Sequence, residues 1–431
     1  YDRFATPQRE LLDHFDGHGP SLEGTAVEIL GEQLQEEGYS FDFISDLQIE
    51  GVKVNNGELI TGGTNYKTLV LPAVKYLPLN TLKEILAQAE NGATVIIHKA
   101  LPESVPGLGN LNERQAEFQE LVESLAFREM NKMIKQATVG SGSVILGEDI
   151  DELLDYAGVE PEEMANQGLQ YARRKYENGH YYFISNWSGS EVDRSIPIQK
   201  EAQSVIIFDP MSGEKGLAKV EKKEEGQTEV YLQIAQGQSL ILITSNQKIE
   251  ESNWNYHQKS DQVISLDGEW EINFISGGPT LPAMRKTEYL TSWTEMGGDY
   301  EYFSGTASYK KDFPKPEGNG WILDLGEVHE SAVVKINGTE IGTLIGPTYQ
   351  IFIDPGLIGE TNTLEIEVSS LMLNRIIDLD RRDVFWKKFY NVNFPPRRSE
   401  HRGKNGLFDA TDIPLAPSGL LGPVRLVNVK N

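Results

Sequence analysis

Residues 321–376 read WILDLGEVHESAVVKINGTEIGTLIGPTYQIFIDPGLIGETNTLEIEVSSLMLNRI. Apolar and polar residues alternate here in short runs that Gly, Pro and Asn-Gly interrupt, which is typical of strands joined by tight turns. Val333 to Ile336 precede the turn Asn337-Gly338, and further strands are predicted at 351–353 and 364–368. The stretch therefore predicts a β domain with at least one two-residue hairpin.

The order of these features resembles the galactose-binding-like jelly roll, an accessory module of large glycoside hydrolases. A strand, an Asn-Gly turn, a second strand and a short Pro/Gly loop are followed by Gly-x-x-Asn-x-Leu at the start of a last strand. The resemblance implies a β-sandwich. It also implies carbohydrate chemistry in a chain that shows no evident catalytic motif.

Composition limits the classes of function. A length of 431 residues predicts about two to four domains, and no apolar run is long enough to span a bilayer. The net charge of −26 argues against nucleic acid and anionic membranes as partners, because both recruit clusters of Lys and Arg. The absence of cysteine excludes disulfides, thiol nucleophiles and Cys-ligated zinc.

Residues 1–164 are predicted to form an α/β domain. Helices are expected at 25–37 and around Leu82, Phe118 and Leu153, and strands at 41–44, 52–54, 58–60, 68–71, 93–97 and 143–146. Strands that alternate with helices indicate a mostly parallel sheet covered on both faces. The domain resembles the flavodoxin-like, class I amidotransferase-like module, whose catalytic Cys this chain lacks, so a structural role is expected.

The first strong element of the chain is a helix, whereas a sheet of this kind usually begins with a strand. The opening YDRFATPQRE is not a signal peptide. We expect that the chain begins inside a domain and is a fragment of a longer polypeptide. The alternative is an α/β domain that begins with a helix.

Residues 165–247 are predicted to form a small antiparallel β domain. Its short strands are expected at 170–174, 180–185, 195–198, 204–208, 229–232 and 239–244, separated by turns such as Asn178-Gly179. Residues 247–265 are expected to be a linker or strap. The last domain, placed at 248–431, is the jelly roll with a long insertion at 374–415. The fold class is thus α/β plus all-β.

Three common catalytic patterns find no support. No Gly-x-Gly-x-x-Gly follows a predicted strand, and no Gly-x-Ser-x-Gly elbow joins a strand to a helix. His14 and His18 have the spacing of zinc ligands on a helix, but Gly17 and Pro20 interrupt that helix. We therefore predict no metal site and no cofactor in this chain.

The densest group of polar and aromatic residues lies at 374–402, NRIIDLDRRDVFWKKFYNVNFPPRRSEHR. Aromatic faces stack on sugar rings, and Arg and carboxylate groups bind hydroxyls. The candidate sugar-contacting residues are Arg375, Asp380, Arg381, Trp386, Tyr390, Asn393 and Arg402. The alternative is an Arg–Asp network that ties a long loop to the sandwich or to a neighbouring domain, since Arg and aromatic residues also mark interfaces.

Asp378 and Asp380 are spaced i, i+2, which on a strand would place both carboxylates on one side. Glycoside hydrolysis requires a pair of carboxyl groups. With 65 acidic residues in the chain, such a pair carries little weight. We assign neither residue as catalytic acid or base.

Several motifs, taken in order, resemble one family. They include YKTLVLPAVKYLPLNTLKEILAQAENGATVI, IIFDPMSGEKG, LDGEWEINFISGGPTLP, SWTEMGG, GLFDATD and PSGLLGPVRL. Together they resemble the C-terminal half of the α-L-rhamnosidase-like glycoside hydrolases of family 106, over roughly residues 35–431.

That resemblance implies a catalytic (β/α)8 barrel upstream, with catalytic glutamates and a calcium site. It also implies inverting hydrolysis, in which one carboxyl group acts as acid and another activates water. Three modules already occupy the 431 residues, so we expect the barrel outside this chain. No catalytic residue is carried over to these positions.

The sequence thus predicts the accessory, carbohydrate-contacting portion of an extracytoplasmic bacterial α-L-rhamnosidase that acts on plant or microbial polysaccharide. Its expected partners are a carbohydrate and the upstream barrel. The alternative is a stand-alone carbohydrate-binding protein without hydrolysis, and a glycosidase for another sugar is a third possibility.

Overall fold

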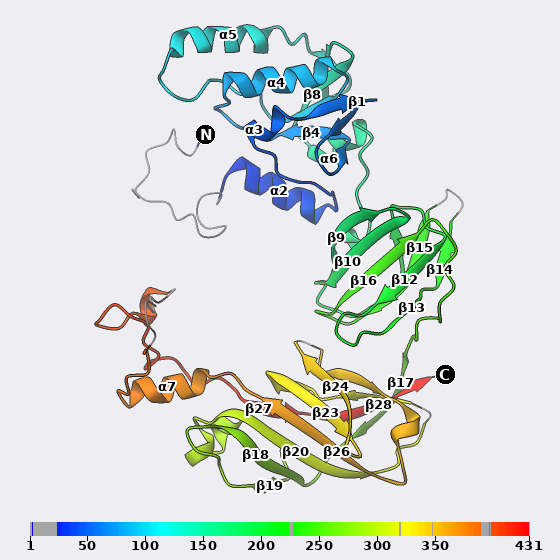
Figure 1. Cartoon of the computed structure of the whole chain (residues 1–431), viewed down its shortest axis with the longest axis vertical. Coiled ribbons are helices and arrows are strands. Elements are labelled where there is room, and N and C mark those ends of the chain that lie inside the picture. The colour runs from blue at the N-terminus through cyan, green and yellow to red at the C-terminus, as the bar shows by residue number, and fades with distance from the viewer. Residues whose placement is uncertain are drawn as a thin grey trace.

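The computed structural model describes residue 2 and residues 24–223, 227–318, 320–346, 348–388, 396 and 398–430. The described chain is rich in strands and passes through three successive parts, which follow one another along its long axis (Figure 1). We name them the α/β part (24–163), the middle part (164–256) and the C-terminal part (257–430). The domain limits predicted at 164 and 247 stay a prediction.

The α/β part is built on a five-stranded sheet with the order β4-β5-β8-β7-β6. Three strands are parallel, namely β4 (Thr68–Leu71), β5 (Thr94–His98) and β8 (Gly142–Gly147). Two continue the sheet antiparallel, namely β7 (Ile134–Val139) and β6 (Arg128–Glu129). The strands β4, β5 and β8 form the predicted parallel part, whereas the antiparallel pairings of β7 and β6 make the whole sheet mixed, which the sequence analysis did not predict.

Helices cover both faces of this sheet. Leu82 and Phe118 bury one face together with Val95, and Leu30 and Leu153 bury the other with residues such as Ile96. The helices are α4 (Leu79–Glu90) and α5 (Leu111–Glu123) on the first face, and α2 (Ala26–Glu36) and α6 (Ile150–Tyr156) on the second. Val95 and Ile96 point to opposite faces because side chains alternate along a strand, which explains the continuous apolar run.

A small hairpin unit precedes the sheet. It contains α3 (Asp46–Ile49), β1 (Lys53–Asn55), β2 (Glu58–Ile60) and β3 (Asn65–Tyr66). Asn56 and Gly57 turn the hairpin with φ values of +50° and +81°, as the Asn-Gly pair predicts. The strand expected at 41–44 is wrong: this segment forms no ladder, and the Phe41 and Phe43 rings pack edge to face at 5.4 Å instead.

The middle part is a sandwich of two antiparallel sheets. One has the order β13-β12-β16-β10-β9 and the other β11-β15-β14. The strands are β9 (Leu169–Tyr176), β10 (Gly179–Asn186), β11 (Val192–Ile198), β12 (Ser204–Phe208), β13 (Lys215–Leu217), β14 (Val220–Lys222), β15 (Thr228–Ile234) and β16 (Ser239–Ser245). All six predicted strands are present, and β13 and β14 are additional. Tyr182, Ile207 and Leu232 lie in the core between the sheets.

The C-terminal part is a larger antiparallel sandwich. Its sheets have the orders β19-β18-β20-β26-β23-β24 and β17-β28-β21-β25, beside a β22–β27 pair. The strands are β17 (Gln258–Ser265), β18 (Trp270–Gly278), β19 (Arg285–Thr287), β20 (Ser304–Pro314), β21 (Trp321–Asp324), β22 (Glu327–His329), β23 (Ser331–Ile336), β24 (Thr339–Ile345), β25 (Gln350–Ile353), β26 (Thr361–Ser369), β27 (Gly419–Gly422) and β28 (Arg425–Lys430). Its assignment to the galactose-binding-like jelly rolls stays a prediction.

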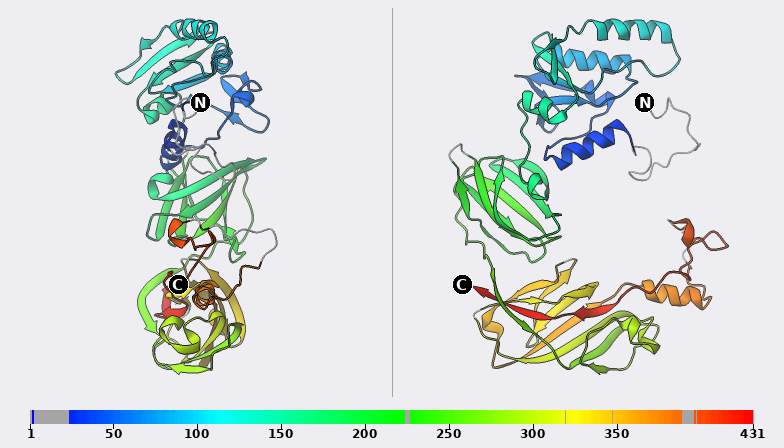
Figure 2. Two further views of the ribbon diagram at one scale, coloured as in Figure 1. Left: turned by 90° about the vertical axis from the view of Figure 1, so that its left-hand side faces the viewer. Right: turned by 180° about the vertical axis from the view of Figure 1, so that it is seen from behind.

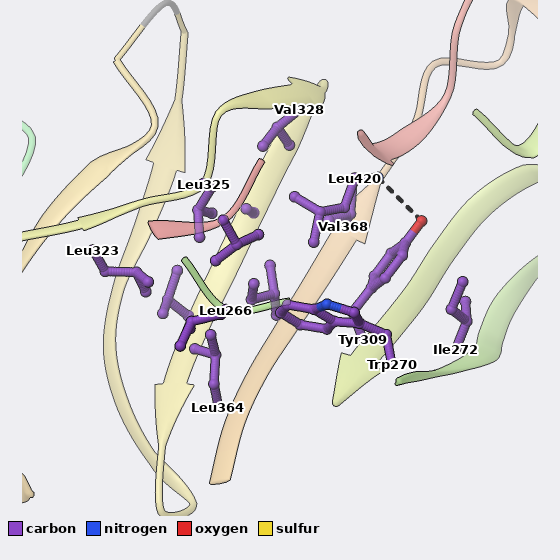
Figure 3. Close-up of a cluster of buried hydrophobic side chains, with 14 of the residues drawn as sticks. Leu266, Trp270, Ile272, Tyr309, Leu323, Leu325, Val328, Leu364, Val368 and Leu420 are labelled. Atoms are coloured by element: carbon purple, nitrogen blue, oxygen red, sulfur yellow. Dashed lines mark hydrogen bonds between the residues drawn. The ribbon is translucent and has the colours of Figure 1, made fainter. Parts of the chain in front are cut away.

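The stretch at 321–376 supplies much of this sandwich. Asn337 and Gly338 turn β23 into β24 with φ values of +51° and +80°, so the predicted hairpin is confirmed. Figure 3 shows Trp270, Tyr309 and Leu364 in the shared core. The Tyr309 hydroxyl accepts hydrogen bonds from Trp293 Nε1 at 2.5 Å and from the Leu420 backbone N–H at 3.0 Å. The phenol oxygen of Tyr309 is therefore hydrogen-bonded although it is fully buried.

The expected strap at 247–265 contacts both sandwiches. Trp254 and Tyr256 pack against the middle core. From Gln258 onward the chain is β17, which pairs antiparallel with β28. The first half of the strap thus packs on the middle part, and its second half is a strand of the C-terminal part.

The remaining elements are short. One α-helix, α7 (Leu373–Arg381), follows β26, and the 3-10 turns are η1 (Ala165–Gln167), η2 (Trp293–Glu295), η3 (Gly298–Tyr300), η4 (Pro355–Leu357) and η5 (Ser399–His401). Within the described ranges, every helix is too short or too polar to cross a membrane. His14, His18, Tyr390 and Asn393 lie outside the described residues.

Candidate functional site

The candidate cluster belongs to the 374–415 insertion, which leaves the sandwich after β26 and returns at β27. Helix α7 and the described residues that follow it project from one end of the C-terminal part (Figure 2). The insertion was expected to be a loop, but it begins with α7. Asn374, Ile377 and Asp378 are the buried residues of this helix, with the i, i+3, i+4 spacing of one helix face.

Asn374 closes the base of the insertion. Its Nδ2 donates to the Ala416 carbonyl at 2.8 Å and to Ser418 Oγ at 3.0 Å. Its Oδ1 accepts the Ala416 backbone N–H at 2.9 Å. Only 2% of Asn374 is exposed. One buried amide therefore joins the two ends of the insertion, and it uses its donor and acceptor groups in doing so.

Asp380 ties the middle of the insertion together. Its Oδ1 accepts hydrogen bonds from Trp386 Nε1 at 2.7 Å and from Lys387 Nζ at 2.8 Å. Its Oδ2 accepts the Ala410 backbone N–H at 2.9 Å. Lys387 Nζ also lies 4.7 Å from the centre of the Trp386 ring. Both oxygens of this carboxylate are thus bonded within the chain.

The two candidate arginines of α7 also bond or pack inside the chain. Arg381 donates to the carbonyls of Thr411 and Ile413 at 3.1 and 3.2 Å. The Arg375 guanidinium packs directly against Gly278. A side chain at position 278 would collide with it, because an added β-carbon would overlap Arg375 Nη1. Arg375 thus packs against the sandwich, and Arg381 holds the returning segment of the insertion.

Asp378 and Asp380 lie on α7, so the expectation for a strand does not apply and their carboxylates do not share a face. The Asp378 carboxylate accepts two hydrogen bonds from the Arg382 guanidinium, from Nε to Oδ1 at 2.9 Å and from Nη2 to Oδ2 at 2.5 Å. Each carboxylate thus has its own basic partner four to seven residues on in the chain. This arrangement stabilises a helix and a loop, and it leaves neither carboxylate free to activate a water.

Of the other candidates, Arg402 is exposed and pairs through its backbone with Phe408. Nearby, the Thr411 hydroxyl and backbone N–H bond the Asp409 carboxylate at 2.6 and 3.0 Å and lower its pKa. Tyr390 and Asn393 lie outside the described residues. The described geometry favours the alternative interpretation of the cluster, a network that holds a long segment to the sandwich.

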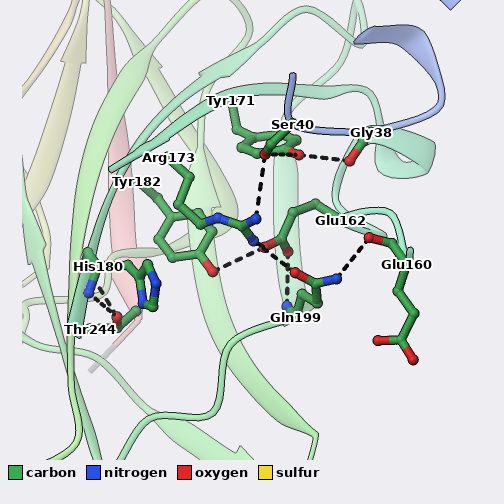
Figure 4. Close-up of polar contacts among 10 residues, drawn as sticks. All are labelled: Gly38, Ser40, Glu160, Glu162, Tyr171, Arg173, His180, Tyr182, Gln199 and Thr244. Atoms are coloured by element: carbon green, nitrogen blue, oxygen red, sulfur yellow. Dashed lines mark hydrogen bonds and ion pairs between the residues drawn. The ribbon is translucent and has the colours of Figure 1, made fainter. Parts of the chain in front are cut away.

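The sequence analysis did not identify a second polar cluster, at the junction of the α/β part and the middle part (Figure 4). Glu162, which is 1% exposed, forms an ion pair with Arg173 of β9. Its oxygens also accept the Tyr182 hydroxyl at 3.0 Å and the Gln199 backbone N–H at 2.8 Å. The Glu162 carboxylate is therefore fully bonded although it is buried.

This junction reaches back to the end of α2. The Tyr171 hydroxyl donates to the Gly38 carbonyl at 2.6 Å, and the Glu162 backbone N–H donates to the same carbonyl at 2.8 Å. Burial raises the pKa of the Tyr182 phenol, and the nearby Glu162 charge adds to that shift. The cluster thus fixes two parts of the chain to each other. Its signal in the sequence is weak, because Glu162 and Gln199 are 37 residues apart.

The part of the chain that the structure describes contains no group of three or more His, Asp or Glu residues placed to hold a metal ion.

Comparison with known proteins identifies the relationship. The family model described as α-L-rhamnosidase, glycoside hydrolase family 106, matches residues 24–221. The solved rhamnosidase from Novosphingobium sp. PP1Y is 25% identical with a TM-score of 0.67, over 90% of this chain and 36% of that chain. A protein of Formosa agariphila named as a candidate β-glucuronidase is 32% identical over 181 residues, 38% of this chain and 16% of that protein.

The chain therefore spans well under two thirds of either relative, 36% of the solved rhamnosidase and 16% of the Formosa protein. The structural match extends across 90% of this chain, whereas the family model covers residues 24–221. Both point to the same carbohydrate-acting group. The chain is similar in sequence and in fold to the α-L-rhamnosidases of glycoside hydrolase family 106.

Proposed function

We propose that this chain is the accessory, carbohydrate-contacting portion of an extracytoplasmic α-L-rhamnosidase-type glycoside hydrolase. The catalytic barrel of that enzyme would lie in another region of the same polypeptide. The proposal is supported by the match of residues 24–221 to the α-L-rhamnosidase family and by the structural likeness to the Novosphingobium rhamnosidase. The whole enzyme would hydrolyse an α-L-rhamnoside of a plant or microbial polysaccharide with inversion.

One observation supports an accessory role most directly. In the candidate cluster, the carboxylates of Asp378 and Asp380 are each occupied by bonds within the chain. An inverting glycosidase needs one free acid and one free base that flank the sugar, about 6.5–9.5 Å apart. Side chains that hold a helix and its return segment together cannot perform those roles without dismantling the insertion.

The test is hydrolysis of an aryl α-L-rhamnoside by the polypeptide encoded by the complete reading frame. NMR of the first product should show the anomer opposite to that of the substrate, because a water attacks from the opposite face of the ring. Retention of configuration would contradict the inverting mechanism. Hydrolysis of a different aryl glycoside in its place would contradict the rhamnoside assignment.

A second function, carbohydrate binding without hydrolysis, is favoured by a separate feature of the middle part. Trp187, which is 76% exposed, lines a shallow hollow of about 300 Å³ with Asn186, Gly189, Gln236 and Gly237. Its indole N–H donates to Ser185 Oγ at 3.0 Å, which orients the ring. The buried Asn186 fixes the same turn, since its Nδ2 donates to three backbone carbonyls. An oriented indole beside the exposed Gln236 amide is suited to stack on a sugar ring and bond its hydroxyls.

A further inference from the structure

The five-stranded sheet of the middle part is apolar on both of its faces. The face turned toward the core carries residues such as Tyr182, Ile207 and Leu242. Side chains of the opposite face alternate with these core side chains along the same strands. They are Tyr181 and Phe183 of β10, Ile206 and Phe208 of β12, and Ile241 and Ile243 of β16. We call these six residues the outer apolar face.

The strand register makes these residues contiguous. Ile243 of the central strand β16 lies opposite Ile206 on one side and Tyr181 on the other. Ile241, two residues earlier, lies opposite Phe208 and Phe183 in the same way. Residues paired across neighbouring strands have β-carbons about 4.5–5.5 Å apart. The six side chains therefore form two adjacent rows across three strands. The Tyr176 ring of β9 extends the patch, 4.8 Å from that of Tyr181.

The second sheet of the same sandwich serves as an internal comparison. Its strands alternate in the ordinary way, with Val192, Val230 and Leu232 in the core. The opposite face of that sheet is mostly polar, with Asp193, Gln233, Glu229 and Glu221. An antiparallel sheet with one solvated face normally shows this pattern of apolar inside and polar outside. The five-stranded sheet departs from the pattern, and its strands resemble strands that are covered on both sides.

The described residues leave much of this face uncovered. Tyr181 and Phe183 are 44% and 46% exposed, and the four other side chains are partly exposed. A contiguous apolar patch of this kind, away from any core, marks an interaction site more often than it marks a solvated surface. Polar groups appear at its margins, for example Arg174 opposite Tyr181 and Lys215 opposite Phe208. An apolar centre with a polar rim is the composition of a protein–protein interface.

We propose that the outer apolar face is the docking surface for an apolar protein surface on the remainder of a longer glycoside hydrolase polypeptide. This inference rests on the proposed function. The structural match includes only 36% of the Novosphingobium rhamnosidase, so most of that enzyme lies outside the matched region. Obligate protein–protein interfaces are more hydrophobic than transient ones, and a face of Ile, Phe and Tyr has that obligate composition.

Two other occupants fit the face less well. A second copy of the chain would bring together two molecules that each carry a net charge of −26, and like charge opposes association. A carbohydrate needs several hydrogen-bonding groups placed among the apolar ones. The side chains of the outer apolar face offer the Tyr181 hydroxyl and nothing further, since the other five are Ile and Phe.

No cysteine occurs in these 431 residues, so an introduced thiol is the one maleimide-reactive cysteine of this chain, and in the longer polypeptide the alkylated peptide that contains the introduced Cys is quantified by mass spectrometry. A Phe183→Cys variant places a thiol on the outer apolar face, and a Glu221→Cys variant places one on the polar face of the other sheet, where Glu221 is exposed. Each variant is made in the 431-residue chain and in the polypeptide of the complete reading frame. The rate of alkylation by a maleimide is then measured in all four proteins, with thermal unfolding as the check that each is folded.

The proposal predicts that the thiol of the Phe183→Cys variant reacts readily in the 431-residue chain. In the longer polypeptide it should react at least about tenfold more slowly, the factor that 1.4 kcal/mol of docking free energy gives. The thiol of the Glu221→Cys variant should react at the same rate in both lengths of chain. Equal rates for the Phe183→Cys variant in the two lengths would overturn the proposal.

Two further outcomes would assign the face to another occupant. If alkylation of the Phe183→Cys variant in the 431-residue chain slows as the protein concentration rises, the face binds a second copy of the chain. If added rhamno-oligosaccharide slows the same reaction, the face binds a sugar. Either result would also overturn the proposal.

Failure of this inference can be told apart from failure of the proposed function. If the longer polypeptide hydrolyses the aryl rhamnoside but the Phe183→Cys thiol stays reactive in it, the function stands and the docking surface does not. If that thiol is protected but no rhamnoside is hydrolysed, the docking surface stands and the enzyme class is wrong. A reading frame that encodes no further domain would overturn both.

Discussion

Asp380 accepts a hydrogen bond from Lys387 Nζ at 2.8 Å, and the pair is almost shielded from solvent, with 7% and 12% of the two side chains exposed. A carboxylate presented to a sugar would instead keep at least one oxygen free at the surface of a cleft. The contact therefore ties the candidate cluster to the architecture of the 374–415 insertion. It leads to a direct test of whether that cluster is a framework or a binding site.

We predict that Asp380→Asn destabilises the insertion. The change leaves the Lys387 ammonium buried without its counter-charge, and breaking one side of a buried ion pair costs about 3–5 kcal/mol. Urea unfolding should show the loss, together with faster proteolysis between residues 384 and 410. The double variant Asp380→Asn, Lys387→Met should recover part of the stability, because it removes both charges. Weaker sugar binding with unchanged unfolding would contradict the framework interpretation.

The junction cluster leads to a matched pair of variants. Glu162→Gln leaves the Arg173 charge without its carboxylate partner, and we expect a loss of about 3–5 kcal/mol for such a change at a buried site. The neighbouring Glu163 is exposed, so Glu163→Gln should change stability by less than about 0.5 kcal/mol. Chemical denaturation of both proteins measures the difference. Equal effects of the two substitutions would show that Glu162 does not hold the α/β part to the middle part.

His180 should give the unfolding free energy a dependence on pH. Burial lowers the pKa of its imidazole to about 4, and the charges of Arg173, Lys200 and Lys175 add to the shift. An unfolded histidine has a pKa near 6.5, so the unfolded state takes up a proton first as the pH falls. The His180 contribution is therefore present above about pH 6.5 and is lost progressively between about pH 6.5 and 4.

A His180→Gln variant isolates this effect from the carboxylates that titrate in the same range. Its unfolding free energy, measured by urea denaturation at several pH values, should fall less steeply than that of the unsubstituted chain between about pH 6.5 and 4. Parallel curves for the two proteins would mean that the imidazole titrates normally. A ring titration followed by NMR provides an independent measure of the same pKa.

Trp187 provides the test of carbohydrate binding by this chain. Trp187→Ala should weaken binding of a rhamno-oligosaccharide by about tenfold or more, because a stacked indole contributes strongly at a binding site. The thermal unfolding temperature should hardly change, since the side chain is 76% exposed. Tyr289→Ala is the matched control, an aromatic residue of the C-terminal part that is 77% exposed. Calorimetry that shows equal binding by both variants would contradict a role for the hollow at Trp187.

The local features of this chain could be predicted from its sequence to a considerable extent. The hairpin at Asn337-Gly338 and the helix around Leu82 follow from backbone preference and apolar spacing, which act over a few residues. The strand expected at 41–44 failed because its alternating pattern says nothing about whether a neighbouring strand is available. The segment around Asn374 was expected to be a loop, although the spacing of Asn374, Ile377 and Asp378 already fits a helix.

The candidate site was harder to predict for a different reason. Sequence shows that Asp380 and Lys387 lie in a dense polar cluster, but it does not show that their charges neutralise each other. The pairing of Glu162 with Arg173 depends on how two parts of the chain meet, which no local pattern encodes. The continuous apolar run at 205–208 did carry a signal for a strand covered on both faces. That signal becomes informative only when the structure shows that one face is open.

The central claim is that the hydrolytic residues lie outside this chain, and one kinetic measurement tests it. Release of nitrophenol from an aryl α-L-rhamnoside is followed for equal concentrations of the 431-residue chain and of the polypeptide from the complete reading frame. We predict hydrolysis by the longer polypeptide and none above the uncatalysed rate by the 431-residue chain. Equal turnover by the 431-residue chain alone would contradict the account, and the acid and base would then have to be sought among its own residues.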